Sequence, residues 1–353
     1  MIRAQGQSAE ADSARVGSRK LVVWLLGTTA CLLLVVAAVN YLVNPYSYYS
    51  PRLLPSLGWH SRRTKVEMLE ARGRAPQALI FGSSRTMKVA PRNVQRLSGL
   101  DTFNACVDSA RVEDWTAMYR YATEVLGAPV EEIVIGADVE AFHDSKEVDP
   151  RLLATYQLRP YVPLAKKWVW YFSATAEAFS GIQFAESLKS LEYHFRGYPP
   201  GKYRFDDEGV LHYVEWEKQI AAGTFKWDPS LDEYDGRLEG MTGLAPWRCR
   251  SFEELLQLTE RRGTRIRLFI TPLHPVLLAH LRQTRNYDSL RAATLAYLQA
   301  RARENRNLKV VDFTEVSAFG GEPDGFLDGA HTTDENSRIM TEALWSQTAF
   351  AAN

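Results

Sequence analysis

The sequence predicts an α/β fold with one apolar helix in front of it. Short apolar runs alternate with helical stretches from about residue 75 onward, which is typical of a three-layer α/β/α domain. The runs are apolar nearly throughout, as expected for parallel strands that are covered on both faces. An uncharged apolar segment near the N-terminus is separate from this pattern.

Five runs favour strands, and we expect them to form a mainly parallel five-stranded sheet of flavodoxin-like order: Gln77–Phe81, Thr102–Val107, Glu132–Gly136, Arg265–Thr271 and Leu308–Phe313. Four stretches between and after them favour helices: Glu113–Leu126, Ser251–Arg262, Leu290–Glu304 and Asp334–Thr348. Together they place the α/β domain over residues 75–145 and 248–353.

The apolar segment Leu21–Val39 has 19 uncharged residues. A membrane-spanning helix needs about 20 such residues, whereas the apolar part of a cleaved signal peptide has about 7–15. We therefore expect a transmembrane signal anchor over residues 21–43, followed by a juxtamembrane linker and helix over 44–74. The alternative is a long signal peptide that is cut near Ala37 or Ala38.

Basic residues flank this segment on one side only. Arg19 and Lys20 precede it directly, while the first basic residue after it is Arg52. Because basic flanks stay in the cytoplasm, we expect residues 1–20 to be an irregular cytoplasmic tail. The rest of the chain then lies on the outer side of the inner (cytoplasmic) membrane, which in a bacterium is the periplasm.

The strand pattern is interrupted over residues 146–247, where we expect a mostly helical insertion. Residues 150–247 hold 19 Phe, Trp and Tyr residues, far above ordinary usage. These side chains either pack the insertion on the core and on lipid headgroups, or form a wall on which sugar rings stack over the active site.

The overall composition excludes some classes of function. Lys plus Arg and Asp plus Glu both number 42, so the chain lacks the positive charge of a nucleic-acid-binding surface. The three cysteines form no CxxC or Cys/His cluster. We expect no metal, no cofactor and no nucleic-acid partner.

Polar residues follow the strands where ligands bind in open parallel sheets, outside the carboxyl ends. Ser84 follows the first strand in a Gly-x-Ser turn, and Asp328 and His331 form an Asp-x-x-His block after the fifth. A hydroxyl, an imidazole and a carboxylate on one edge are the set that nucleophilic acyl transfer needs. Ser84 is the candidate nucleophile, His331 the base and Asp328 the group that orients it.

These two blocks resemble those of the SGNH, or GDSL-type, hydrolases. Phe81–Ser84 is similar to the family's first block, with Ser83 in place of the Asp, and Phe326–His331 is similar to its last block. The branch that the chain most resembles is membrane-anchored and extracytoplasmic. It includes the D-alanyl-transfer protein of teichoic-acid synthesis and SGNH partners of polysaccharide O-acetylation. The resemblance does not explain the insertion.

The middle blocks depart from the family pattern. Ser109 stands where the family has a Gly whose N–H helps to bind the oxyanion, and a backbone N–H survives that change. Asp138 stands where the family has an Asn that donates to the oxyanion. An ionised Asp cannot donate and would repel the oxyanion. Three interpretations are open: Asp138 is protonated, the site does not catalyse, or Asp138 turns away to pair with a cation. We expect an ion pair with Arg85, because the first and third strands of such folds are neighbours.

His274 follows the fourth strand on the same edge. It is either a substrate contact or a structural histidine that is hydrogen-bonded within a turn.

The resemblance implies a membrane-anchored acyltransferase or esterase that acts on an extracellular glycan or another envelope polymer. It also implies a multipass membrane acyltransferase as partner, because the acyl donor has to cross the membrane. The alternatives are a non-catalytic envelope assembly or glycan-binding protein on the same scaffold, and a lipid or peptidoglycan esterase that acts alone.

Overall fold

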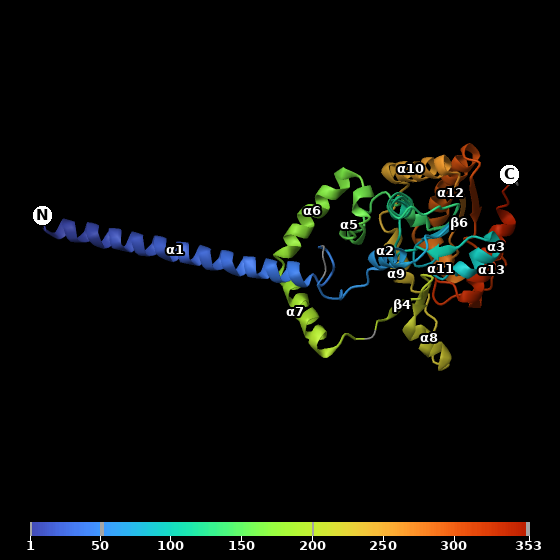
Figure 1. Cartoon of the computed structure of the whole chain (residues 1–353). Coiled ribbons are helices and arrows are strands. Elements are labelled where there is room, and N and C mark those ends of the chain that lie inside the picture. Colours follow the sequence, from blue (N-terminus) through green and yellow to red (C-terminus); the bar gives the residue numbers. More distant parts are fainter. Residues whose placement is uncertain (1, 50–52, 200, 351–353) are drawn as a thin grey trace. The chain divides into compact units, whose positions relative to one another are not determined.

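The computed structural model describes residues 2–49, 53–199 and 201–350, and these divide into two compact units (Figure 1). One unit comprises the chain up to Trp59 together with Lys167–Pro199. The other comprises His60–Lys166 and the chain from residue 200 onward. Arg52, which entered the prediction of membrane orientation, lies outside the described residues.

The larger unit is built on the expected sheet. Its strand order is β2-β1-β3-β6-β7, and every neighbouring pair is parallel. This confirms the flavodoxin-like order, with the first and third strands side by side. The strands are β1 (Ala78–Gly82), β2 (Thr102–Asn104), β3 (Glu132–Ala137), β6 (Arg265–Ile270) and β7 (Leu308–Asp312).

Helices cover both faces of the sheet, as the alternating pattern predicts (Figure 1). Helix α4 packs against α10, and α3 packs against α13. The stretch expected to be helical to Leu126 leaves the α-helical form at Arg120 and continues as a π-helical turn. The helices that surround the sheet are α2 (Ser61–Ala71), α3 (Pro91–Ser98), α4 (Val112–Arg120), α10 (Pro246–Arg262), α11 (Pro275–Thr284), α12 (Tyr287–Glu304) and α13 (Asp334–Gln347).

The insertion is mostly helical, but it also contains a short antiparallel strand pair that the sequence pattern did not predict. Helix α7 and the part of α6 from Lys167 onward belong to the smaller unit, and the remaining elements of the insertion belong to the larger one. The elements of the insertion are α5 (Pro150–Ala154), α6 (Leu164–Ala178), α7 (Gly181–Arg196), β4 (Tyr203–Phe205), β5 (Leu211–Tyr213), α8 (Val214–Ala221) and α9 (Leu231–Leu238).

The smaller unit contains the apolar helix α1 (Ile2–Val43). Its part Arg19–Val43 is long and apolar enough to cross a membrane, with a mean hydropathy of 2.5, although a signal sequence meets the same criteria. The prediction of an irregular tail over residues 1–20 is wrong for the described residues of that stretch, because α1 begins at Ile2. No proline interrupts this stretch, and the helix ends where Asn44 turns left-handed before Pro45.

A pair of glycines fixes the end of β1 beside β3. Gly82 and Gly136 are register partners, and the turn after β1 folds back so that the Thr86 side chain covers both. A Cβ atom at either glycine would overlap Thr86 Oγ1. The turn that carries Ser84 therefore lies closer to β3 than any residue with a side chain would permit.

We predict that Gly136→Ala lowers the free energy of unfolding by about 1–3 kcal/mol, the usual range for overpacking. Thr86→Ala removes the two nearest obstructing atoms and leaves Phe269 Cζ at 2.9 Å from the new Cβ, so the double variant should recover part of the loss. Chemical denaturation of the full-length chain in detergent measures both. Gly73→Ala, which meets no atom within 4 Å, is the control. A double variant no more stable than Gly136→Ala would contradict the overlap.

Candidate active site

Ser84, His331 and Asp328 form one continuous chain of hydrogen bonds. His331 Nε2 lies 2.9 Å from Ser84 Oγ, and His331 Nδ1 lies 2.7 Å from Asp328 Oδ2. All three residues are buried. The strand order thus brings the end of β1 next to the loop after β7. Ser84 and His331, which meet there, are 247 residues apart in the sequence.

The electrostatics of Asp328 fix the roles of the two imidazole nitrogens. Burial raises the pKa of this carboxyl, but the charge of His331 and several hydrogen bonds outweigh that effect and lower the pKa to about 2. Asp328 Oδ1 accepts from the backbone N–H groups of Ala330 and His331. An ionised carboxylate has no proton to give, so His331 Nδ1 donates and Nε2 accepts from Ser84.

Tyr234 is a fourth member of this network that sequence reasoning missed. It comes from α9 in the insertion, and its hydroxyl donates to Asp328 Oδ2 at 3.1 Å and lies 3.2 Å from His331 Nδ1. Burial and the neighbouring Asp328 raise the pKa of Tyr234 well above its usual value, so the hydroxyl stays protonated. The insertion therefore helps to orient the catalytic carboxylate.

Arg85, the residue after the candidate nucleophile, is fully buried between two carboxylates. Its guanidinium lies 3.4 Å from Asp138, which confirms the expected pair, and 2.5 Å from Glu140, a second partner that was not predicted. Burial lowers the pKa of Arg85, but the two carboxylates outweigh it and raise the pKa overall. Asp138 also accepts a hydrogen bond of 2.7 Å from the Thr271 hydroxyl.

Ser109, which is expected to bind the oxyanion through its backbone N–H, has a backbone conformation that suits glycine, with φ of 50°. The backbone N–H groups of Ser109 and Ser84 donate to no other residue in the described part of the chain. Both are therefore free to bind a developing oxyanion.

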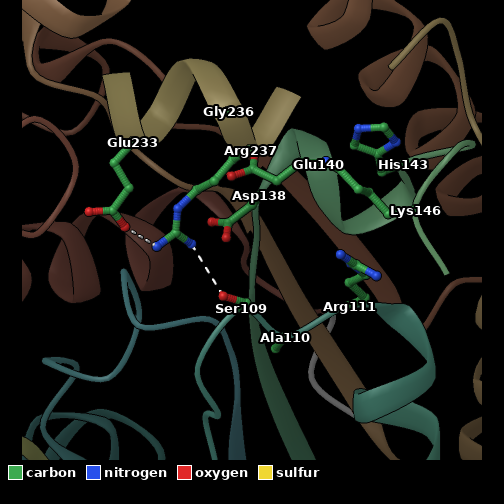
Figure 2. A pocket seen from close by; sticks show the side chains of 10 residues that line it. All are labelled: Ser109, Ala110, Arg111, Asp138, Glu140, His143, Lys146, Glu233, Gly236 and Arg237. Carbon is green, nitrogen blue, oxygen red and sulfur yellow. Dashed lines mark hydrogen bonds and ion pairs between the residues drawn. The ribbon is translucent and has the colours of Figure 1, made fainter. Parts of the chain in front are cut away.

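A cavity of about 260 Å³ opens beside Ser109 and is lined by polar side chains of both signs. Figure 2 shows Arg237 reaching from α9 toward Ser109, with Asp138 beside it. Arg237 donates to Ser109 Oγ at 3.4 Å and to Glu233 at 2.6 Å. A second helix-borne group from the insertion thus reaches the oxyanion side of the site.

Aromatic side chains from the insertion surround His331 on another side. The Tyr213 and Trp216 rings stack with centroids 4.5 Å apart, and their centroids lie 5.5 and 6.4 Å from that of His331. Both side chains also line a cavity of about 500 Å³. These contacts are compatible with the sugar-stacking interpretation of the insertion, while Tyr213 is also buried as a packing residue would be.

His274 lies near the triad but outside its hydrogen-bond chain. Its Nδ1 accepts from the backbone N–H of Val276 and caps α11, while its backbone N–H donates to Gly329 in the loop of Asp328. The ring centroid lies 4.5 Å from that of Trp227, and burial lowers the pKa of His274. This geometry matches the structural interpretation, and no contact with Ser84 or His331 accompanies it.

Sequence reasoning missed Tyr234, Arg237 and Glu140. The high aromatic content of the insertion was the only signal for Tyr234, and nothing marked Arg237. Among residues 2–49, 53–199 and 201–350, no group of three or more His, Cys, Asp or Glu side chains is arranged to hold a metal ion.

No family model and no curated protein matches this chain. Among solved structures, it is similar to a proposed acylhydrolase from Bacteroides fragilis, with 12% identity and a TM-score of 0.36, over 81% of this chain and 92% of that one. It is also similar to a proposed lipolytic protein of the G-D-S-L family from Desulfitobacterium hafniense, with 11% identity and a TM-score of 0.31, over 76% and 97%. We therefore base the functional proposal on the geometry of the site.

We predict that Arg85→Ala lowers the free energy of unfolding by about 3–5 kcal/mol, because two carboxylates then stay largely buried without a cation. Arg282→Ala is the matched control, since Arg282 also holds two carboxylates, Asp288 and Glu315, but at the surface. The free energy of unfolding should fall much less in Arg282→Ala than in Arg85→Ala. Thermal and denaturant unfolding measure both, and equal losses would show that the Arg85 pair is no stronger than a surface pair.

Proposed function

We propose that this chain is a membrane-anchored serine esterase or O-acyltransferase of the SGNH type. The observation that carries the proposal is the hydrogen-bonded chain from Ser84 through His331 to the ionised Asp328. Acyl transfer requires a nucleophile, a base and a group that orients the base. Here the three side chains are in contact, and the His331 tautomer is the one that can accept the Ser84 proton.

The geometry supports a two-step reaction. Ser84 Oγ attacks the ester carbonyl carbon of an acyl donor, and its proton passes to His331 Nε2. The carbonyl oxygen becomes an oxyanion that the backbone N–H groups of Ser84 and Ser109 bind. His331 returns the proton to the departing alcohol, which leaves an acyl group on Ser84. Water or an acceptor hydroxyl then attacks that ester, with His331 as base, and Ser84 regains its proton.

The proposed substrate is a glycan or another polymer of the cell envelope. The stacked rings of Tyr213 and Trp216 beside His331 support a sugar ring on the alcohol side of the ester. The apolar helix and the basic residues before it support an inner-membrane anchor with the catalytic unit in the periplasm. In the transferase form of the proposal, a multipass membrane acyltransferase supplies the acyl group.

One observation favours a non-catalytic envelope assembly or glycan-binding protein instead, namely an Asp at the position of the family's oxyanion-binding Asn. The ion pair of Asp138 with Arg85 and its hydrogen bond from Thr271 offset that carboxylate. We therefore prefer the enzyme, and a reagent that reacts with activated serines separates the two functions.

We predict that a fluorophosphonate probe labels the wild-type chain at Ser84 and that Ser84→Ala abolishes the label. Ser83→Ala is the matched control, because Ser83 is the neighbouring hydroxyl and accepts from the Arg85 backbone N–H rather than contacting His331. It should keep most of the labelling. Mass spectrometry locates the adduct. An unlabelled wild-type chain would favour the binding protein, and a label at Ser83 would place the nucleophile one residue earlier.

We further predict that Tyr234→Phe slows esterase turnover by about 10- to 100-fold, the value of a hydrogen bond of about 1.5–3 kcal/mol to a charged group. Its effect should fall on kcat rather than KM, since Tyr234 acts through Asp328. Tyr213→Phe is the control, because the buried Tyr213 hydroxyl has no partner among the described residues. Equal turnover in both variants would remove Tyr234 from the catalytic network.

A further inference from the structure

The insertion sends two helices back to the anchor helix. Helices α6 and α7 meet at residues 178–181, and that corner is tied to α1 by the buried side chain of Asn40. Asn40 Nδ2 donates to the carbonyl oxygens of Ala178 and Ser180 at 3.0 Å each, and the Ser187 hydroxyl donates to Asn40 Oδ1 at 3.0 Å. The Tyr49 hydroxyl adds a bond of 2.7 Å to the carbonyl of Ala174.

These bonds fix where along α1 the two helices attach. Asn40 lies in the last turn before α1 ends at Val43. The apolar part of α1, Arg19–Val43, has 25 residues and is about 37 Å long. This length slightly exceeds the thickness of the bilayer's hydrocarbon core, which is about 30 Å. If α1 spans the bilayer, its last turn lies at the membrane surface. The corner between α6 and α7 then lies there too.

Each of the two helices carries an exposed apolar stripe. On α6, Trp168 and Phe172 lie four residues apart on one face and are 58% and 76% exposed, and Phe179, directly after the helix, is 45% exposed. On α7, Phe184, Leu188, Leu191 and Phe195 recur at i, i+4, i+7 and i+11. Phe195 is 82% exposed, although it is one of the largest apolar side chains in the unit.

Charged residues occupy the other faces of these helices. Glu177 lies opposite the stripe of α6, and Glu186 and Lys189 lie opposite that of α7. This two-faced pattern is that of helices that lie in a membrane interface. Trp and Tyr are the residues that favour this depth, and Tyr41 of α1 and Tyr171 of α6 are both exposed.

We propose that the apolar stripes of α6 and α7 lie in the interfacial layer of the bilayer from which α1 emerges. The occupant of this face is lipid, because α6 and α7 are attached to the last turn of the apolar helix α1, where Tyr41 and Leu42 are exposed as well. The inference rests on the proposed membrane anchoring. It adds that the smaller unit contacts the bilayer along two further helices and not through α1 alone.

The test uses the full-length chain in phosphatidylcholine and phosphatidylglycerol vesicles. Single cysteines replace Phe172 or Phe195 in a Cys31→Ala, Cys249→Ser background and carry an environment-sensitive fluorophore. Cys106 stays, because it is buried and its raised thiol pKa keeps it unreactive. We expect blue-shifted emission and strong quenching by lipids with a nitroxide near the headgroup. Glu177→Cys and Lys189→Cys are the polar-face controls and should be quenched by a water-soluble agent instead.

The outcomes separate the inference from the anchoring on which it rests. A fluorophore on the native Cys31 of a Cys249→Ser chain reports the anchoring, because Cys31 lies in the middle of the apolar segment and should be quenched by a nitroxide deep in the acyl chains. If Cys31 is quenched while positions 172 and 195 behave like the polar controls, the inference is wrong and the anchor stands. If positions 172 and 195 are shielded from both water and lipid quenchers, a protein covers this face and the inference is equally wrong.

Discussion

The burial of one guanidinium between two carboxylates is the interaction on which the candidate active site depends. Arg85 follows Ser84 directly, and its partners Asp138 and Glu140 follow β3. Because β1 and β3 are neighbours in the sheet, this ion pair holds the turn of the nucleophile against the end of β3. The guanidinium also lies 5.2 Å from the centre of the Tyr234 ring, so it links the sheet edge to α9 as well.

This ion pair explains how an Asp is accommodated at the position where the resemblance to SGNH hydrolases implies an Asn. A free carboxylate beside the oxyanion would oppose the negative charge that develops there. Here Arg85 offsets the charge of Asp138, and the Thr271 hydroxyl occupies one of its oxygens. The substitution removes a side-chain donor but does not leave an uncompensated charge. In the proposed reaction, the backbone N–H groups of Ser84 and Ser109 are then the donors that bind the oxyanion.

The sheet and the triad could be predicted from the sequence because both follow from local patterns. Continuous apolar runs identified the five strands of the parallel sheet. The second strand ends at Asn104 rather than Val107, because of the backbone N–H groups beyond Asn104 only those of Ala105 and Val107 still donate to β1. Parallel strands bring their carboxyl ends to one edge, so Ser84 and His331 could be expected to meet. Tyr234 could not be predicted, since it lies in the insertion, outside the pattern of parallel strands, and reaches Asp328 only through tertiary packing of α9.

The aromatic residues of the insertion show where such prediction stops. The same excess of aromatic residues serves two roles, since the buried Tyr234 bonds to Asp328 of the candidate triad and the exposed Phe195 belongs to the smaller unit. Helical spacing alone cannot separate these roles, because a stripe that packs on protein and a stripe that faces lipid have the same period. The exposure of the side chains distinguishes the two roles, because Tyr234 is 1% exposed and Phe195 is 82% exposed. A long connection between two strands costs little extra closure entropy. One insertion can therefore contribute Tyr234 to the candidate triad and also contribute two helices to the unit that contains the apolar helix α1.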